Sequence, residues 1–330
     1  MIEAESRIGC SILEQSATEF LEVCPICGYR DYHLIHDRGA IYNDINRTTH
    51  VETQICHRCG VLFTNPRLPE ELVKNFYKHE QGVLHNNQNL SALVNQKPKA
   101  LTKVRTEFFN QWMTDVQRVL EVGGGGLNFA VSMAKSYPDI RFDELDPSLP
   151  QNDFLLPNLR LISGFLDLAF ADALADRYHA VVAFHVLEHQ YMPKDFLKII
   201  KRTLVDKGLL FLEVPYPFSP FWMRKPIDAC FRTVHPFNFT LRSIQYLLES
   251  TGFEILGHDM SSYTMVRIAA RVGKANGILI PLSSRDLSRI DRFMNSWKIY
   301  SRLARMKAFA KPAHLYAEWA WYRRKNVNML

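Results

Sequence analysis

Short apolar runs alternate with longer amphipathic stretches over the middle of the chain. Runs at 119–122, 180–184 and 208–215 have the length and composition of buried strands. The stretch 100–113 instead has helical spacing, with apolar residues at Leu101, Val104, Phe108 and Trp112. This alternation of predicted strands and helices is typical of an α/β fold.

A glycine-rich loop follows the first of these strands, where residues 119–126 read Val-Leu-Glu-Val-Gly-Gly-Gly-Gly. Glycine adopts positive φ and lets a ligand approach the backbone closely. The helix expected from Leu127 would aim free N–H groups at the same crevice. A dinucleotide site uses the same elements, and a purely structural turn is a further alternative, so the loop alone does not decide the ligand.

An acidic residue ends the next predicted strand, at 140–146. Asp146 lies about 20 residues after the loop, at the distance expected of a ribose-binding carboxylate. Glu144 competes for this role, and Asp146 could instead form the turn before Pro147 and Ser148. We expect Asp146 to be the ribose ligand.

Four motifs in order resemble those of class I S-adenosylmethionine-dependent methyltransferases. They are the glycine loop, Leu-Asp-Pro-Ser at 145–148, His-Val-Leu-Glu-His at 185–189 and Lys-Gly-Leu-Leu-Phe-Leu-Glu-Val-Pro at 207–215. The resemblance implies a Rossmann-like α/β fold with a seven-stranded sheet, closed by an antiparallel pair at 253–260 and 265–272. It implies S-adenosyl-L-methionine at the carboxyl ends of the first strands. The cofactor-binding residues that it implies are Glu121, Gly123, Gly124, Gly125, Asp146 and His185.

Two positions depart from the family pattern. Leu127 stands where the family has the third glycine of its loop, and His179 stands where an acid begins the fourth strand. Leu127 could tighten the methionine pocket or change how the cofactor sits. If it closed the site, the chain would be a binding protein built on a methyltransferase core.

Two Cys-x-x-Cys knuckles, each followed by glycine, precede this region. They contain Cys24 and Cys27, and Cys56 and Cys59, with room between them for a two-stranded ribbon. Four thiolates suit a closed tetrahedral zinc site, which we expect to be structural because no coordination position is left open. A redox dithiol is an alternative. His57 inside the second knuckle is expected to face solvent, and Cys10 and Cys230 to be unpaired.

The ribbon ahead of such a core resembles a bacterial group that methylates sugars and natural products. In the sugar C-methyltransferases of that group, a Tyr-x-Glu-His run supplies catalytic residues, and the aligned residues here are Arg232-Thr233-Val234-His235. The histidine is kept, but the tyrosine and glutamate are absent, which argues against carbanion chemistry. Transfer to oxygen or nitrogen needs only one base and good alignment.

The candidate catalytic residues are therefore histidines with one neighbouring acid. His235 is the first candidate for the base, although it could instead be a buried histidine held in a loop. His185 and His189 are alternatives. Glu188 and His189 could also orient His185, or they could cap the helix that follows, since an acid suits its first turn. His185 could also hold the cofactor.

Composition and charge set the remaining expectations. With 330 residues, 47% hydrophobic, the chain can form a large core and a small second lobe. We predict a zinc-ribbon lobe at 1–85, a methyltransferase core at 86–275 and a helical tail at 276–330. The first residues form no apolar signal, and 208–222, the most apolar later stretch, is interrupted by a glutamate and three prolines. We therefore expect a cytoplasmic enzyme that does not cross a membrane.

The surplus of positive charge lies in the tail. Residues 271–330 carry 13 basic and 3 acidic side chains, whereas residues 1–80 carry 8 and 12. Phe293, Trp297, Tyr300 and Ala304 recur there at helical spacing, which predicts a basic amphipathic helix. Its aromatic face could pack on the core as a lid or homodimer contact, or the helix could hold a phosphorylated or lipid-linked acceptor at a membrane surface.

The sequence predicts the methyl acceptor only as a broad class of molecule. We expect a small-molecule or glycan acceptor, such as a sugar or a nucleotide-linked sugar. The alternative is RNA, gripped by the ribbon and the basic tail. The acidic balance of residues 1–80 and the lack of an Asn-Pro-Pro-Tyr-type motif after the fourth strand make nucleic acid the weaker prediction.

Overall fold

The computed structural model describes residues 18–40, 50–76, 94, 99–149, 153–219, 221–224, 227, 230–231, 235–261, 264–274 and 281–305. The strands are β1 (Tyr32–Ala40), β2 (His50–Cys56), β3 (Leu62–Thr64), β4 (Arg118–Val122), β5 (Arg141–Asp146), β6 (Asp153–Leu156), β7 (Leu159–Ser163), β8 (Tyr178–Phe184), β9 (Leu204–Pro215), β10 (Phe237–Asn238), β11 (Phe253–Asp259) and β12 (Met265–Val272). The α-helices are α2 (Glu70–Phe76), α5 (Ala100–Asn110), α6 (Asn128–Ser136), α7 (Leu168–Ala173), α8 (Pro193–Thr203), α9 (Leu241–Ser250) and α10 (Ser284–Arg305). Two 3₁₀ turns are η2 (Leu187–His189) and η3 (Trp222–Arg224).

The central sheet contains eight strands among the described residues, in the order β11-β12-β9-β8-β4-β5-β7-β6. The strands β9, β8, β4, β5 and β7 run parallel, and β11 and β12 form the expected antiparallel pair. The additional strand is β6, which pairs antiparallel with β7 at the edge. Asn158 stabilises the hairpin between them because its side chain donates to the carbonyl oxygens of Ala134, Tyr137 and Ile140. The expectation of seven strands missed this hairpin.

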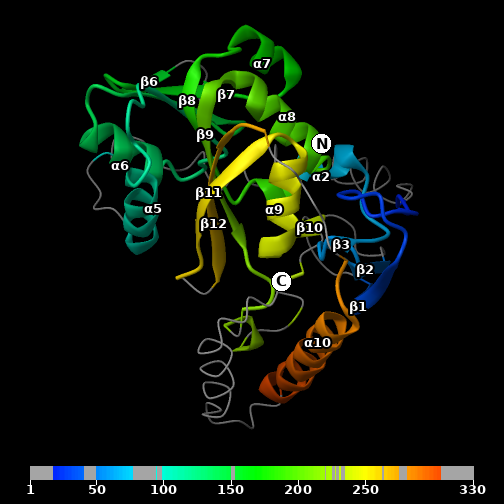
Figure 1. Cartoon of the computed structure of the whole chain (residues 1–330). Coiled ribbons are helices and arrows are strands. Elements are labelled where there is room, and N and C mark those ends of the chain that lie inside the picture. The colour runs from blue at the N-terminus through cyan, green and yellow to red at the C-terminus, as the bar shows by residue number, and fades with distance from the viewer. Residues whose placement is uncertain are drawn as a thin grey trace, which may run out of the picture.

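Alternation along the strands gives the sheet two apolar faces. Val119, Ala180, Val182 and Phe211 face α5 and α6, while their neighbours Leu120, Val181, Ala183 and Leu210 face the opposite side, which α8 and α9 cover. Figure 1 shows these helices on either side of the sheet. The strand order reverses between β4 and β8, and this leaves a crevice at the carboxyl ends of these two strands. An open α/β sheet binds its ligand in such a crevice.

A second, four-stranded sheet has the order β1-β2-β3-β10 and forms a small lobe beside α9 (Figure 1). The expected two-stranded ribbon is present, because β1 and β2 pair antiparallel between the two knuckles. The strand β10 comes from the middle of the chain, and its pairing with β3 was not predicted. Lobe and central sheet share one apolar core, which runs from Ile26 and Leu62 to Leu212.

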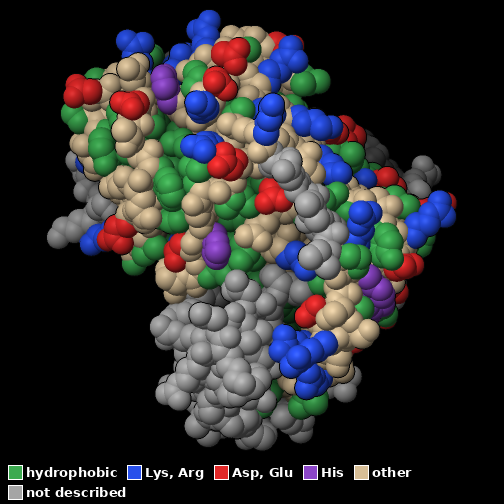
Figure 2. Space-filling view, in the orientation of Figure 1, with side chains coloured by type: hydrophobic (Ala, Val, Ile, Leu, Met, Phe, Trp, Pro, Cys, Tyr) green, Lys and Arg blue, Asp and Glu red, His purple; other side chains and the backbone are tan. Residues whose placement is uncertain are grey.

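The helix α10 confirms the predicted helix in the tail, and its burial pattern is amphipathic from residue 284 to residue 300. Its aromatic face packs on the rest of the protein: Phe293 contacts Phe218, and the fully buried Trp297 contacts Phe231. Lysine and arginine side chains gather on the outer surface of α10 (Figure 2). Arg285 and Arg292 of this helix are exposed.

Some expected features lie outside the described residues, among them the boundary at residue 85, Cys10, Arg232 to Val234 and the tail beyond 305. Within the part of the chain that the structure describes, no helix is both long and apolar enough to span a membrane.

Candidate functional site

The glycine loop lies at the switch point between β4 and β8. Gly123 has φ +70°, and a Cβ there would come within 2.6 Å of Val186, the second residue after β8. A Cβ on Gly124 would overlap the Glu144 carboxylate. Side chains at these two positions would therefore displace the start of the loop after β8 and an acid of β5, which explains the glycines.

Both competing acids contact this loop. Glu144 Oε1 accepts a hydrogen bond from the Gly124 N–H at 2.7 Å, and Asp146 Oδ2 accepts one from the Gly125 N–H at 3.2 Å. The other Asp146 oxygen accepts from the backbone N–H and the hydroxyl of Ser148, as expected of a turn former. Asp146 therefore contacts the loop and forms the turn, so these contacts do not decide between its two predicted roles.

Glu121 lies directly opposite Glu144 on the adjacent parallel strand. Both side chains are buried, and in each the Oε2 atom has no hydrogen-bond partner among the described residues. Burial raises the pKa of Glu144, and the neighbouring Glu121 carboxylate raises it further. Burial also raises the pKa of Glu121. Two buried carboxyl oxygens without partners next to a glycine loop fit a ligand that forms hydrogen bonds, as the ammonium and hydroxyl groups of S-adenosylmethionine do.

Leu127 adopts the conformation that a glycine would favour. It is the N-cap of α6 with φ 56° and ψ 3°, in the left-handed region. Its side chain is buried in the apolar layer of Phe109, Phe129 and Ala130, rather than exposed at the surface. The backbone at this position is therefore one that glycine would adopt without strain, and apolar burial of Leu127 offsets part of the backbone cost.

The four candidate catalytic side chains meet at the carboxyl end of β8. His185 Nδ1 lies 3.2 Å from Glu188 Oε1, and His189 Nε2 lies 3.9 Å from the same oxygen. The ring of His189 packs edge-on against the ring of His235, with centroids 4.5 Å apart. Residues 185–189 are neighbours in sequence, but His235 reaches them from the segment before β10. The structure thus joins all four predicted residues in one cluster.

Sequence reasoning missed three further members of this charged network. Glu213, fully buried near the end of β9, forms ion pairs with Arg105 of α5, Arg267 of β12 and His185, whose Nε2 lies 3.1 Å away. The Arg105 guanidinium also lies over the ring of Phe184, 4.6 Å from its centroid. A glutamate inside the apolar run 208–215 was the signal that could have indicated a buried ion pair.

These contacts set the charge of His185. Burial lowers the pKa of this imidazole, but its hydrogen bonds to Glu188 and Glu213 outweigh burial and raise the pKa to about 9. Burial raises the pKa of Glu213, but His185 and Arg105 lower it to about 2. His185 is therefore an imidazolium ion at neutral pH and has no lone pair with which to accept a proton from an acceptor.

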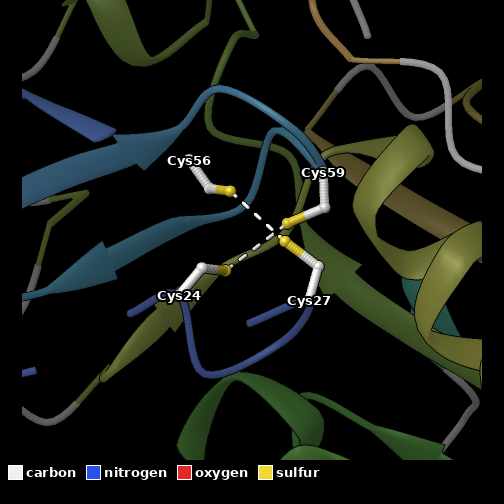
Figure 3. Close-up of side chains that lie close together, drawn as sticks. All are labelled: Cys24, Cys27, Cys56 and Cys59. Atoms are coloured by element: carbon white, nitrogen blue, oxygen red, sulfur yellow. Dashed lines mark hydrogen bonds between the residues drawn. The ribbon is translucent and has the colours of Figure 1, made fainter. Parts of the chain in front are cut away.

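The four knuckle cysteines converge in the small lobe, and Figure 3 shows their side chains pointing at one another. All four sulfur atoms lie within 4.8 Å of one another, with Cys24 and Cys59 3.6 Å apart and Cys27 and Cys56 3.5 Å apart. A tetrahedral zinc site with Zn–S bonds of about 2.3 Å has its sulfurs about 3.8 Å apart, so the cluster could hold this ion.

The knuckles have the same backbone conformation. Gly28 donates its N–H to the carbonyl of Cys24, and Gly60 donates to that of Cys56, with φ of +70° and +73°. These positive φ values explain the glycine after each pair. The expectation that His57 faces solvent was only partly right: His57 Nε2 lies 2.8 Å from His33 Nδ1, and the side chain is half-buried.

An open sheet of this order, with a glycine loop at the switch point and acids at the ends of β4 and β5, defines a Rossmann-like class I methyltransferase fold. A family model described as "Methyltransferase domain" matches residues 86–258. The chain belongs to this family and is an S-adenosylmethionine-dependent methyltransferase. No curated protein matches the chain in sequence.

Several solved structures are similar to the chain at low sequence identity. The [4+2]-cyclase SpnF is 12% identical with a TM-score of 0.43, over 61% of this chain and 97% of that one. A SAM-dependent methyltransferase from Archaeoglobus fulgidus is 14% identical with a TM-score of 0.40, over 52% and 93%. The CurJ carbon methyltransferase is 13% identical with a TM-score of 0.43, over 62% and 70%.

Proposed function

We propose that this enzyme moves the methyl group of S-adenosylmethionine to an oxygen, or a nitrogen, of a sugar, nucleotide-linked sugar, glycan or natural-product acceptor, with His235 as the base. One observation carries the proposal. His235 packs against His189 at the end of β8, and the same loop contacts Gly123 through Val186. A histidine pair therefore lies next to the expected position of the donor.

The charge of His185 decides how the roles are divided among the three histidines of the cluster. When bound, S-adenosylmethionine supplies an electrophilic methyl group. His235 accepts the proton that the acceptor hydroxyl or amine loses as it is methylated, with His189 as its neighbour. His185 is excluded as a base because it is already protonated, and it instead holds Glu188 and Glu213 in place. The Tyr-x-Glu-His run of the C-methylating enzymes is incomplete here, which supports oxygen or nitrogen as the target.

On the donor side, we propose that Asp146 binds the ribose hydroxyls and that the space left by the missing side chains at Gly123 to Gly125 receives the rest of the donor. The orphaned Oε2 atoms of Glu121 and Glu144 support a donor ammonium or hydroxyl group in this crevice. His185 lies at its edge, where it fits a role in cofactor binding better than a role in catalysis.

In the small lobe, we propose that Cys24, Cys27, Cys56 and Cys59 hold a structural zinc ion. The sulfur separations support this assignment. All four ligands would come from the protein, so no position remains for substrate. A zinc–thiolate site and the unpaired Cys230 also support a reducing, cytoplasmic location, because both need cysteines that are not oxidised to disulfides.

The tail is proposed to serve the acceptor side. Because the aromatic face of α10 is buried on the core, contact with a membrane or with a lipid-linked acceptor would have to use its opposite face, where Arg285 and Arg292 are exposed. Attraction of these arginines to phosphate groups is the physical basis of this proposal.

The test is replacement of the base. His235→Ala is expected to lower turnover about 100-fold or more while the Kd for S-adenosylmethionine, measured by calorimetry, stays within about twofold. Acceptors would be screened as nucleotide sugars, glycans and RNA by following S-adenosylhomocysteine formation. The matched control is His258→Ala, at an exposed histidine of β11. Full turnover in His235→Ala would remove the base assignment, and methylation of RNA alone would remove the acceptor class.

A further inference from the structure

The small lobe and the proposed base are connected by a continuous set of hydrogen bonds. We propose that the four-cysteine site is the positioning element for His235: metal in the cluster holds the second knuckle, the knuckle holds β3, and β3 holds the backbone of His235. The inference rests on the proposed roles of His235 and of the cysteines. It predicts that metal occupancy controls the acceptor side of the enzyme and leaves the donor side unchanged.

The first link joins the knuckle to β3. The N–H of Cys56 donates to the carbonyl of Val61 at 3.0 Å, which closes the knuckle, and β3 begins at the next residue, Leu62. With only three residues, β3 has little intrinsic stability, so its position depends on the elements at its two ends. A metal ion that ties Cys56 and Cys59 to the first knuckle therefore also restrains the start of β3.

The second link joins β3 to the base. Leu62 and Asn238 are partners in the β3–β10 ladder. The Thr64 N–H then donates to the carbonyl of Pro236 at 3.0 Å, and the Thr64 hydroxyl donates to the carbonyl of His235 at 3.3 Å. Thr64 is 4% exposed, so water does not easily replace these bonds. The Thr64 hydroxyl thus holds the backbone of His235, and the Thr64 N–H holds the backbone of the next residue, Pro236.

A third contact holds the other end of the same segment. The Thr240 hydroxyl donates to the carbonyl of Gly60, directly after Cys59, at 3.2 Å. Thr240 is also the N-cap of α9 and forms a capping box with Ser243. The segment from His235 to Thr240 is therefore hydrogen-bonded at both ends, to Thr64 of β3 at His235 and to Gly60 of the second knuckle at Thr240. It has little freedom to move while the knuckle keeps its conformation.

The second knuckle is also linked, through α10, to the segment after β9. The Leu282 N–H donates to the carbonyl of His57 at 2.8 Å, just before α10 begins. From α10, Phe293 packs on Phe218 and Trp297 packs on Phe231. Both partners lie after β9, between this strand and His235, and we propose that this segment helps to form the acceptor side. Two routes thus lead from the second knuckle to acceptor-side residues.

The hydrogen bonds that shape the donor side come from the central sheet. The contacts of Glu144 and Asp146 with the glycine loop come from β4 and β5. Gly123 donates its N–H to the carbonyl of Leu145 on β5, and the space where a Cβ would lie is limited by Val186, after β8. These strands belong to the central sheet, and their pairing does not include the small lobe. Loss of the metal should therefore leave donor binding intact.

The first experiment tests the link at Thr64 in the metal-loaded, full-length protein. Thr64→Val keeps the shape of the side chain and removes its hydroxyl, leaving the His235 carbonyl without this bond. We expect kcat to fall about tenfold, the Kd for S-adenosylmethionine to stay unchanged, and the imidazole NMR signals of His235 to shift. The matched control is Thr53→Val, on β2, one strand further from β10. Unchanged His235 signals and unchanged kcat in Thr64→Val would overturn the proposal.

The second experiment removes the metal with a chelator and follows amide hydrogen exchange. We expect exchange to accelerate in β3 and β10, to stay slow in β4 and β8, and donor affinity to persist. Slow exchange in β10 and unshifted His235 signals after full metal loss would overturn the role of the metal. If stripping unfolds the protein, or metal analysis finds none, Thr64→Val still decides whether the lobe positions His235. If His235→Ala keeps full turnover, His235 fails as a proposed base, while the NMR and exchange results still decide the positioning link.

Discussion

Replacement of Glu188 by glutamine should destabilise this protein more strongly at pH 6 than at pH 10. Glu188 and Glu213 together raise the pKa of His185 from 6.5 to about 9 against the opposing effect of burial. A group with a raised folded-state pKa contributes stability that is fully present below its unfolded pKa and is lost as pH rises through the folded pKa. The contribution of His185 is therefore complete below pH 6.5 and gone above about pH 9.

The size of this difference follows from the pKa of His185, because Glu188 and Glu213 both contribute to its rise. Loss of one should lower the pKa of His185 by about one unit, equivalent to about 1.4 kcal/mol of unfolding free energy at pH 6. The buried amide of the new glutamine adds a cost of about 1–3 kcal/mol that does not depend on pH. The variant should therefore be more strongly destabilised at pH 6 than at pH 10, by about 1.4 kcal/mol.

The assay is urea unfolding of wild type and Glu188→Gln at both pH values, with the His185 pKa followed by NMR. Glu254→Gln is the control, because Glu254 pairs with Arg271 near the surface, away from any histidine cluster. That control should be destabilised equally at both pH values. An equal loss for Glu188→Gln at pH 6 and pH 10, with His185 still titrating near 9, would refute this account of the cluster.

Three further outcomes are expected. Gly124→Ala should weaken S-adenosylmethionine binding at least tenfold in calorimetry, because the new Cβ would overlap the Glu144 carboxylate; wild-type affinity would contradict this. Leu127→Gly should relieve the left-handed backbone but leave a cavity, so we expect a net loss of about 2 kcal/mol in urea unfolding with donor affinity unchanged. Trp297→Ala should cost about 3–5 kcal/mol because the indole is fully buried, and a loss below 1 kcal/mol would mean that α10 is not docked.

Local patterns in the sequence determined most of the central sheet. Runs of buried apolar residues predicted β4, β8 and β9, and the acid and turn residues at 145–148 placed the end of β5. The knuckles were predictable for the same reason, since each Cys-x-x-Cys-Gly unit is a short segment whose glycine needs a positive φ. Such features depend on residues close in sequence, so spacing and residue type are enough to find them.

Features that depend on distant residues were decided by the tertiary structure. The strand β10 has only two residues and no pattern of its own, and it exists because β3 is there to pair with it. Burial of Glu213 among Arg105, Arg267 and His185 needs four separate elements to meet, so no local spacing could announce it. The contact of His235 with His189 is of the same kind. The sequence by itself determined which groups could do the chemistry, whereas packing of the lobe against the sheet decided which of them meet, because charge and hydrogen bonding act over a few ångströms in space and not along the chain.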